Sequence, residues 1–305
     1  MIKQFADEFV SQQRALGFKY RVQGGLIKSY ATFAQERGDT FIKVDRVIEW
    51  SALAPSSNQK RNRLLIVRRF ALSAHAIDPV HEIPSADTYG RSTYRRRKPY
   101  IFTSEELSKL QQAALRMTPK ESTRPMTFYT LLTLLWVSGL RISEALSLDV
   151  SDITEDGLLV RATKFRKNRV IPIHCSTRRA LALYLKNDSR KNVAIDEAVF
   201  VSTLGTRLSY SCARTGFNEL IDSVGLRGTS NQSSKCLHDM RHSFALRSLE
   251  QCPACAHTVK KHMVALSTYM GHAHITDTYW YLEATTGLTQ KIAKLTEARH
   301  EEVRK

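Results

Sequence analysis

The chain has 305 residues, 42% of them hydrophobic, which is enough for two domains that each bury a core. Lys and Arg number 46 against 29 Asp and Glu, a formal net charge of +17. This excess favours a polyanionic partner, with nucleic acid ahead of an anionic membrane surface. A signal-peptide pattern and an apolar run long enough to span a bilayer are both absent, so we expect a soluble, non-exported protein.

The first part of the chain predicts a small all-helical domain over residues 1–88. Apolar residues recur there at spacings of three and four, which indicates helices with one buried face. These residues are Phe5, Phe9, Leu26, Tyr30 and Phe33. A later helix, expected to begin near Ser56 or Ser57, carries basic side chains suited to lying across DNA. They are Lys60, Arg61, Arg63, Arg68 and Arg69.

A purely basic segment follows this domain. Residues 91–99, RSTYRRRKP, contain five basic and no acidic residues. Between two folded parts, such a segment is suited to lying along a phosphate backbone, and a solvated linker is the alternative. We expect a linker over residues 89–100, with DNA contacts from Arg95, Arg96, Arg97 and Lys98.

The remainder predicts helices interrupted by a hairpin. Thr103 or Ser104 can cap a helix in FTSEELSKLQQAA. The segment TFYTLLTLLWVSG predicts a mostly buried helix that stops at Gly139, and another helix, RISEALSL, begins directly after it. The segment GLLVRATKFRKNRVIPI predicts two strands around the polar turn Lys164–Arg169, AVFVST predicts a further short strand, and helices and loops follow Tyr210. The chain is therefore expected to be mainly α, with a small antiparallel β-sheet in its second domain.

The five cysteines indicate reduced thiols, because they are odd in number and sparse in a long chain. Cys252 and Cys255 form a CxxC pair with His257 and His262 nearby, so a zinc site is conceivable. A second ligand pair that would complete it is missing, and no βαβ pattern supports a redox motif. We expect no metal.

Several polar side chains of the second domain are ordinary when taken singly. They occur in the order Arg141, Lys164, His238, Arg241, His272 and Tyr281. Arg141 begins a helix after a glycine, and Glu144 lies three residues on, the spacing of a common surface pair. His238 and Arg241 would share one helix face. A buried histidine, a histidine at a helix end and a solvated lysine on a turn would each explain the remaining members.

Taken together, these side chains suit attack on a phosphodiester without a metal. Two guanidiniums can hold the non-bridging oxygens and match the charge of a pentavalent transition state. A tyrosine can act as the nucleophile, but its ordinary pKa of about 10 means that a neighbour must help to remove the proton. A lysine on a hairpin can protonate the departing oxygen, and imidazoles complete the hydrogen bonding.

Four segments resemble the tyrosine recombinase (phage integrase) family: SGLRISEALSLDVSDI, TKFRKNRVIPI, HDMRHSFA and MGHAHITDTYWY. The resemblance covers residues 100–285 approximately. In that family the nucleophile lies nine residues beyond the histidine of the Gly-His pair, which implies Tyr281 and leaves Tyr279 as a packing residue. Thr163 and Phe165 replace glycines that often flank the hairpin lysine, so Lys167 is the alternative to Lys164.

The resemblance also implies a role for each remaining site residue. Arg141 and Arg241 would clamp the phosphate, and Lys164 would be the general acid. His238 and His272 would be supporting acid/base groups and hydrogen-bond donors, with Glu144 supporting Arg141 from behind. The implied architecture is a C-shaped two-domain DNA clamp, in which the N-terminal helices are the core-binding domain and residues 101–305 the catalytic domain. A C-terminal helix, residues 286–305, would pack on a neighbouring protomer or on its own domain.

The implied function is site-specific DNA recombination, with strand cleavage through a 3′-phosphotyrosine and neither a metal nor a high-energy cofactor. The wording of the motifs resembles transposon and recombinase-in-trio integrases of mobile elements. The implied DNA partner is double-stranded, with an inverted-repeat core site. The chain would bind each site as a dimer and two sites as a tetramer, with other recombinases of the same element as possible partners. The implied location is the bacterial cytoplasm, at the nucleoid. The alternatives are a non-cutting accessory DNA-binding protein and relaxation like that of a type IB topoisomerase.

Overall fold

The computed structural model describes residues 2–90, 99–161, 168–191, 194–228, 235–251, 256–272, 274, 276–278 and 281, with side chains from residue 259 onward in the helix that begins at 256. The chain divides into two compact units, Met1–Arg96 and Arg97–Lys305. Some residues named above lie outside the described part: Arg95, Arg96, Arg97, Lys98, Lys164, Lys167, Cys252, Cys255, Tyr279 and 286–305. Within the described ranges, no helix is both long and apolar enough to cross a membrane.

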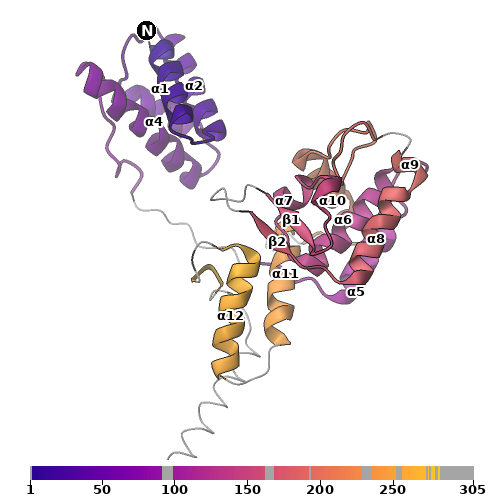
Figure 1. Ribbon diagram of the computed structural model, residues 1–305. Coiled ribbons are helices and arrows are strands. Elements are labelled where there is room, and N and C mark those ends of the chain that lie inside the picture. Colours follow the sequence, from indigo (N-terminus) through magenta and orange to yellow (C-terminus); the bar gives the residue numbers. More distant parts are fainter. Residues whose placement is uncertain are drawn as a thin grey trace, which may run out of the picture. The chain divides into compact units, whose positions relative to one another are not determined.

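The N-terminal unit is a bundle of helices (Figure 1). Its elements are α1 (Ile2–Ala15), α2 (Arg21–Gln35), α3 (Val44–Ala52) and α4 (Ser57–Ile77). The predicted start of α4 is confirmed, since the Ser56 side chain accepts a hydrogen bond from the backbone N–H of Gln59. The apolar faces meet in one core that contains the buried rings of Phe9, Tyr30, Trp50 and Phe70.

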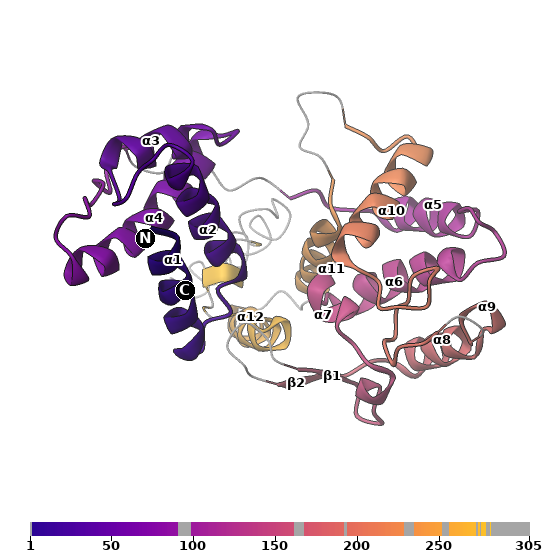
Figure 2. The same ribbon diagram turned by 90° about the horizontal axis from the view of Figure 1, so that it is seen from above.

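The C-terminal unit is built around one mostly apolar helix, α6 (Arg124–Ser138), in which ten of the fifteen residues are buried. The other helices are α5 (Ser104–Ala114), α7 (Ile142–Leu146), α8 (Cys175–Lys186), α9 (Asp188–Lys191), α10 (Tyr210–Ser223), α11 (Leu237–Glu250) and α12 (Ala256–Met270), with a 3-10 turn at Val150–Asp152. Helices α5, α8, α10 and α11 all contact α6, and they surround it in Figure 2. Burial on most sides explains why α6 shows no wide polar face.

A two-stranded antiparallel sheet stands beside these helices. Strand β1 (Leu158–Val160) pairs with β2 (Arg169–Ile171) in the register Leu158–Ile171 and Val160–Arg169. The predicted hairpin and the mainly α fold class are therefore confirmed. The sequence placed Arg169 in the turn, whereas it begins β2. The predicted strand AVFVST is wrong, because Ala198 and Val201 make only isolated bridges there.

Helix ends decide where the polar side chains of this unit lie. Of the two predicted caps of α5, Thr103 is the one used, and it forms a capping box with Glu106. Gly139 ends α6 in the left-handed conformation, at φ 59°. A Cβ on Gly139 would lie 2.3 Å from the Phe244 ring, so this turn requires glycine. The chain then enters α7 with Arg141 in the N-cap position.

Candidate active site

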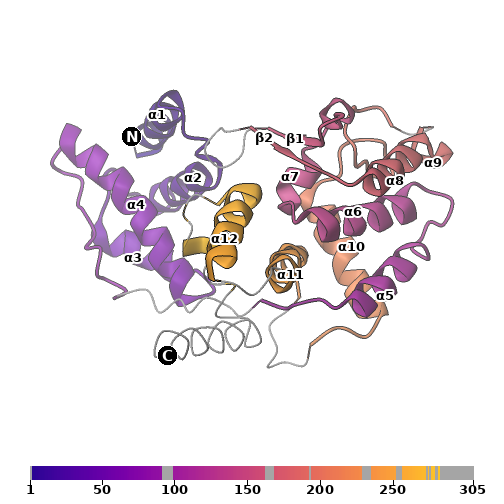
Figure 3. The same cartoon turned by 60° about the horizontal axis from the view of Figure 1, so that its bottom comes forward.

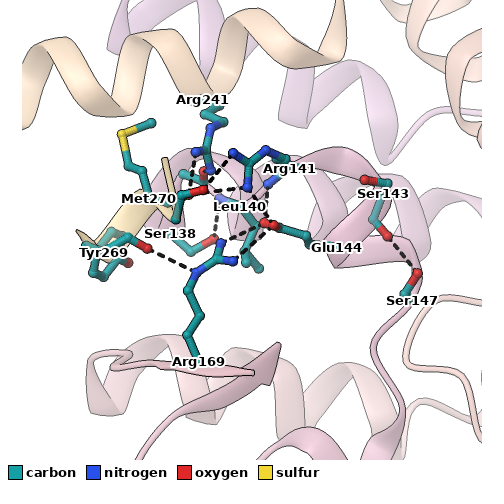
Figure 4. A network of polar contacts seen from close by, with 12 residues as sticks. Ser138, Leu140, Arg141, Ser143, Glu144, Ser147, Arg169, Arg241, Tyr269 and Met270 are labelled. Atoms are coloured by element: carbon teal, nitrogen blue, oxygen red, sulfur yellow. Dashed lines mark hydrogen bonds and ion pairs between the residues drawn. The ribbon is translucent and has the colours of Figure 1, made fainter. Parts of the chain in front are cut away.

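The carboxyl end of α12 is the point at which the polar side chains gather. The last carbonyls of a helix have no partner within it and carry partial negative charge. Here they accept hydrogen bonds from three guanidiniums, those of Arg141, Arg169 and Arg241 (Figure 4). These arginines come from the start of α7, from β2 and from α11, so the end of α12 fixes three separate elements against one another.

Arg141 is held by both α7 and the end of α12. Its guanidinium donates to Glu144 Oε1 at 2.9 Å, to the Met270 carbonyl at 3.3 Å and to the Gly271 carbonyl at 3.0 Å. The other oxygen of Glu144 accepts from the Arg141 backbone N–H at 2.9 Å. The predicted support of Arg141 by Glu144 is therefore a direct contact in the structure.

Arg241 is the more deeply buried guanidinium, with 2% of the residue exposed. It donates to the Gly139 carbonyl at 2.7 Å and to the Met270 carbonyl at 2.6 Å. Burial, and then the nearby charge of Arg141, lower the pKa of Arg241 to about 10, so it remains charged at neutral pH. Two cations thus share the Met270 carbonyl oxygen, an arrangement suited to receiving an anion.

Arg169 belongs to the same network, although the sequence did not single it out. Its guanidinium donates to Glu144 Oε1 at 3.1 Å and to Oε2 at 2.8 Å, and its Nε donates to the Tyr269 carbonyl at 3.1 Å. Burial alone would raise the pKa of Glu144, but the hydrogen bonds from Arg169 and Arg141 outweigh it and hold that pKa below its ordinary value. Glu144 is therefore an ionised carboxylate between two arginines.

Tyr281 lies in the apolar seam between α11 and α12, which stand side by side in Figures 1 and 3. The residue is only 3% exposed. Its phenolic oxygen lies 2.9 Å from Nδ1 of His242, and the His272 ring stacks against it with centroids 6.3 Å apart. Tyr281 also acts electrostatically on Arg241. The described residues of this segment, 276–278 and 281, are helical.

The two predicted histidines approach the site from different elements. His238 lies on α11 and meets the His242 ring edge-on, with centroids 4.7 Å apart. Burial, and then the charge of Arg241, lower the pKa of His238, so it is neutral at pH 7. His272 follows the end of α12, and its Nδ1 lies 2.7 Å from the Thr278 hydroxyl oxygen.

The structure therefore brings together five of the six side chains predicted to be catalytic, with Glu144 behind them; Lys164 lies outside the described residues. Sequence reasoning missed His242 and Arg169. His242 had a detectable signal, because it lies four residues after His238 and shares its helix face. Arg169 had none, since a basic residue in a predicted polar turn is ordinarily solvated.

Comparison with known proteins identifies the chain. Residues 101–287 match the model of the phage integrase family. The chain belongs to that family. It is 36% identical to "Putative integrase/recombinase y4rB" of Sinorhizobium fredii over 314 residues, 98% of each chain. It is 29% identical to tyrosine recombinase XerC of Chlamydia pneumoniae, over 56% of this chain and 49% of that relative.

Solved structures show the same fold. A lambda integrase tetramer bound to a Holliday junction aligns with TM-score 0.64 and 17% identity, over 91% of this chain and 76% of that one. The Tn1549 transposon integrase in complex with transposon right end DNA aligns with TM-score 0.62 and 18% identity, over 100% and 99%. This member of the phage integrase family is a tyrosine recombinase, an enzyme of DNA recombination and integration.

The predicted DNA-binding residues of this recombinase on α4 are partly engaged within the N-terminal unit. Arg61 and Arg68 donate to the carbonyls of Gly90 and Pro84, and Arg63 stacks over the Trp50 ring at 5.1 Å. Arg69 is exposed and Lys60 is half-exposed. A guanidinium has five N–H donors, so an arginine that holds one carbonyl retains donors for a phosphate.

Proposed function

We propose that this tyrosine recombinase cuts and rejoins specific DNA sites of a mobile element through Tyr281. The observation that carries the proposal is the sharing of the Met270 carbonyl by the guanidiniums of Arg141 and Arg241, beside the seam that holds the Tyr281 phenol. Two fixed cations next to one phenol are what a metal-free attack on a phosphodiester requires. Ionised Glu144 and Arg169 keep the Arg141 guanidinium in place.

The reaction exchanges one phosphodiester for another. The Tyr281 oxygen attacks phosphorus, the bond to the 5′ oxygen breaks, and a 3′-phosphotyrosine forms while the phenolic proton leaves to a base. Lys164 supplies a proton to the 5′ oxygen, His238 and His272 hydrogen-bond to the phosphate, and the two arginines match the charge on its oxygens. Rejoining reverses each transfer, so the energy of the broken bond is retained and no high-energy cofactor is consumed.

The proposed DNA partner is supported by the charge of the chain and by the solved structures that share its fold. A net charge of +17 supports binding to double-stranded DNA mostly through its phosphates, with affinity that falls steeply as salt rises. The N-terminal unit would be the core-binding domain and would present α4, with Arg69 the most exposed of its five bases. The lambda integrase neighbour is a tetramer on a Holliday junction. We therefore propose one dimer on each inverted-repeat site and a tetramer when two sites recombine.

The test is capture of the covalent intermediate on a suicide DNA that is nicked beside the scissile phosphate, so that the cleaved end diffuses away. We expect a protein–DNA adduct from the wild type and from Tyr279→Phe, and none from Tyr281→Phe. An adduct that survives Tyr281→Phe would refute the assignment of the nucleophile. DNA binding without an adduct on any half-site would instead indicate a non-cutting accessory protein, and relaxation without exchange of paired sites would indicate a topoisomerase.

A further inference from the structure

Helix α11 presents two neighbouring side chains to two different parts of the site. Successive residues of an α-helix point about 100° apart around the axis. Arg241 reaches the carbonyls of Gly139 and Met270, whereas His242 turns toward the seam between α11 and α12. The same helical turn therefore positions a cation for the phosphate and an imidazole for the nucleophile.

The contact between His242 and Tyr281 has the geometry of a proton-transfer pair. The phenolic oxygen lies 2.9 Å from Nδ1, and the ring centroids are 5.5 Å apart at 55°. Apolar side chains hold the Tyr281 ring in the seam, among them Ala245, Leu249 and Met263. A general base must lie within hydrogen-bond distance of the proton that it removes, and His242 does so.

Four other polar groups of the site are less suited to accept this proton. Arg141 and Arg241 are cations with no acceptor atom. Both oxygens of Glu144 already accept hydrogen bonds from Arg141 and Arg169. Nδ1 of His272 lies 2.7 Å from the Thr278 hydroxyl oxygen. An imidazole in the tautomer that carries its hydrogen on Nε2 presents a lone pair at Nδ1.

We propose that His242 is the general base that takes the proton from Tyr281, an inference that rests on the proposed function. As the oxygen–phosphorus bond forms, the phenolic O–H bond breaks and its proton passes to Nδ1 of His242, which becomes an imidazolium. The bond to the 5′ oxygen breaks at the same centre, and that oxygen takes its proton from the separate general acid. On rejoining, His242 returns the proton to the departing phenolate. The bonds and protons of cleavage and rejoining therefore balance without any further reactant.

The experiment measures single-turnover adduct formation on the nicked suicide DNA at saturating protein. His242→Gln keeps a polar side chain of similar reach but removes the basic nitrogen. We expect adduct formation to slow by roughly 10²–10⁴-fold, the usual contribution of a general base. The matched control is His262→Gln, the same substitution at a half-buried histidine on α12 whose Nε2 lies 3.0 Å from the Ser248 hydroxyl. It should leave both the rate and the affinity for DNA unchanged.

A second readout separates proton transfer from a packing role. Replacing Tyr281 with a fluorotyrosine of lower pKa gives a phenol that ionises without help. In the His242→Gln protein this change should raise the rate of adduct formation by about tenfold or more relative to His242→Gln with the natural tyrosine. Added imidazole should likewise accelerate His242→Ala. A packing role predicts recovery by neither route.

Three outcomes would overturn the assignment. They are an unchanged rate in His242→Gln, a slowed rate that neither fluorotyrosine nor imidazole restores, and a faster rate, which would make His242 a latch that restrains the nucleophile. Failure of the proposed function is recognised separately, because the wild-type protein would then form no adduct at all.

Discussion

The network around Glu144 predicts a large loss of stability when Arg169 is truncated. Arg169→Ala removes two charge-assisted hydrogen bonds to Glu144 and one to the Tyr269 carbonyl. The side chains of Arg169 and Glu144 are only 15% and 8% exposed, so water replaces these bonds poorly. Breaking a buried ion pair from one side costs about 3–5 kcal/mol. Glu144 keeps its contacts with Arg141, which places the expected loss at about 3 kcal/mol.

The assay is denaturant or thermal unfolding of the full chain in a Trp50→Phe background, where the remaining tryptophans, Trp136 and Trp280, belong to the C-terminal unit. For a unit of this size, about 3 kcal/mol corresponds to a melting temperature lower by roughly 6–12 °C. The control is Arg227→Ala, which breaks an ion pair with Asp222 whose side chains are 76% and 39% exposed. Exposed pairs contribute about 0–1 kcal/mol. Equal losses in Arg169→Ala and Arg227→Ala would refute the reasoning.

Acid should remove the same contribution. The pKa of Glu144 is lower in the folded protein than its ordinary value of 4.5, so the folded state binds this proton less readily than the unfolded chain does. The stability that Glu144 supplies is therefore complete above about pH 4.5 and is lost as the pH falls through its lower folded pKa. The difference between wild type and Arg169→Ala should shrink over that range. A difference that stays constant there would exclude Glu144 as its source.

Three further predictions test other parts of the site. Burial and then Arg241 lower the pKa of His238, so NMR should show it titrating below 6.5. The wild type should lose stability as the pH falls from 6.5 toward this lower folded pKa, and His238→Gln should not show that loss. Gly139→Ala places a Cβ against Phe244 and should cost about 3 kcal/mol in thermal unfolding, against about 1 kcal/mol for Gly225→Ala, which has a φ of 69° and open space around it. Arg241→Lys should slow adduct formation by roughly 10²–10³-fold with little change in DNA affinity, because an ammonium cannot hold two carbonyls and a phosphate in one plane.

Several features were set by the sequence alone because they depend on neighbours along the chain. The start of α5 after a capping residue and the end of α6 at Gly139 are local hydrogen-bond and backbone requirements. The sequence predicted a cap at Thr103 or Ser104 and a stop at Gly139, and the structure has Thr103 as the cap and Gly139 in the left-handed conformation. The hairpin was predictable for the same reason, from two β-rich arms around a polar turn. His238 and Arg241 share a helix because three residues separate them. The order of these local signals along the chain was sufficient to indicate the family.

Other features were decided only by tertiary packing. Arg169 meets Glu144 across 25 residues of sequence and the Tyr269 carbonyl across 100, and no local pattern encodes those distances. AVFVST has the composition of a strand, yet without a continuous partner it forms only isolated bridges. The contact between His242 and Tyr281 exists because α11 packs against α12 and leaves an apolar seam for the ring. Local hydrogen bonding and backbone preference fix where helices begin and end, whereas the partner of a polar side chain depends on which elements burial brings together.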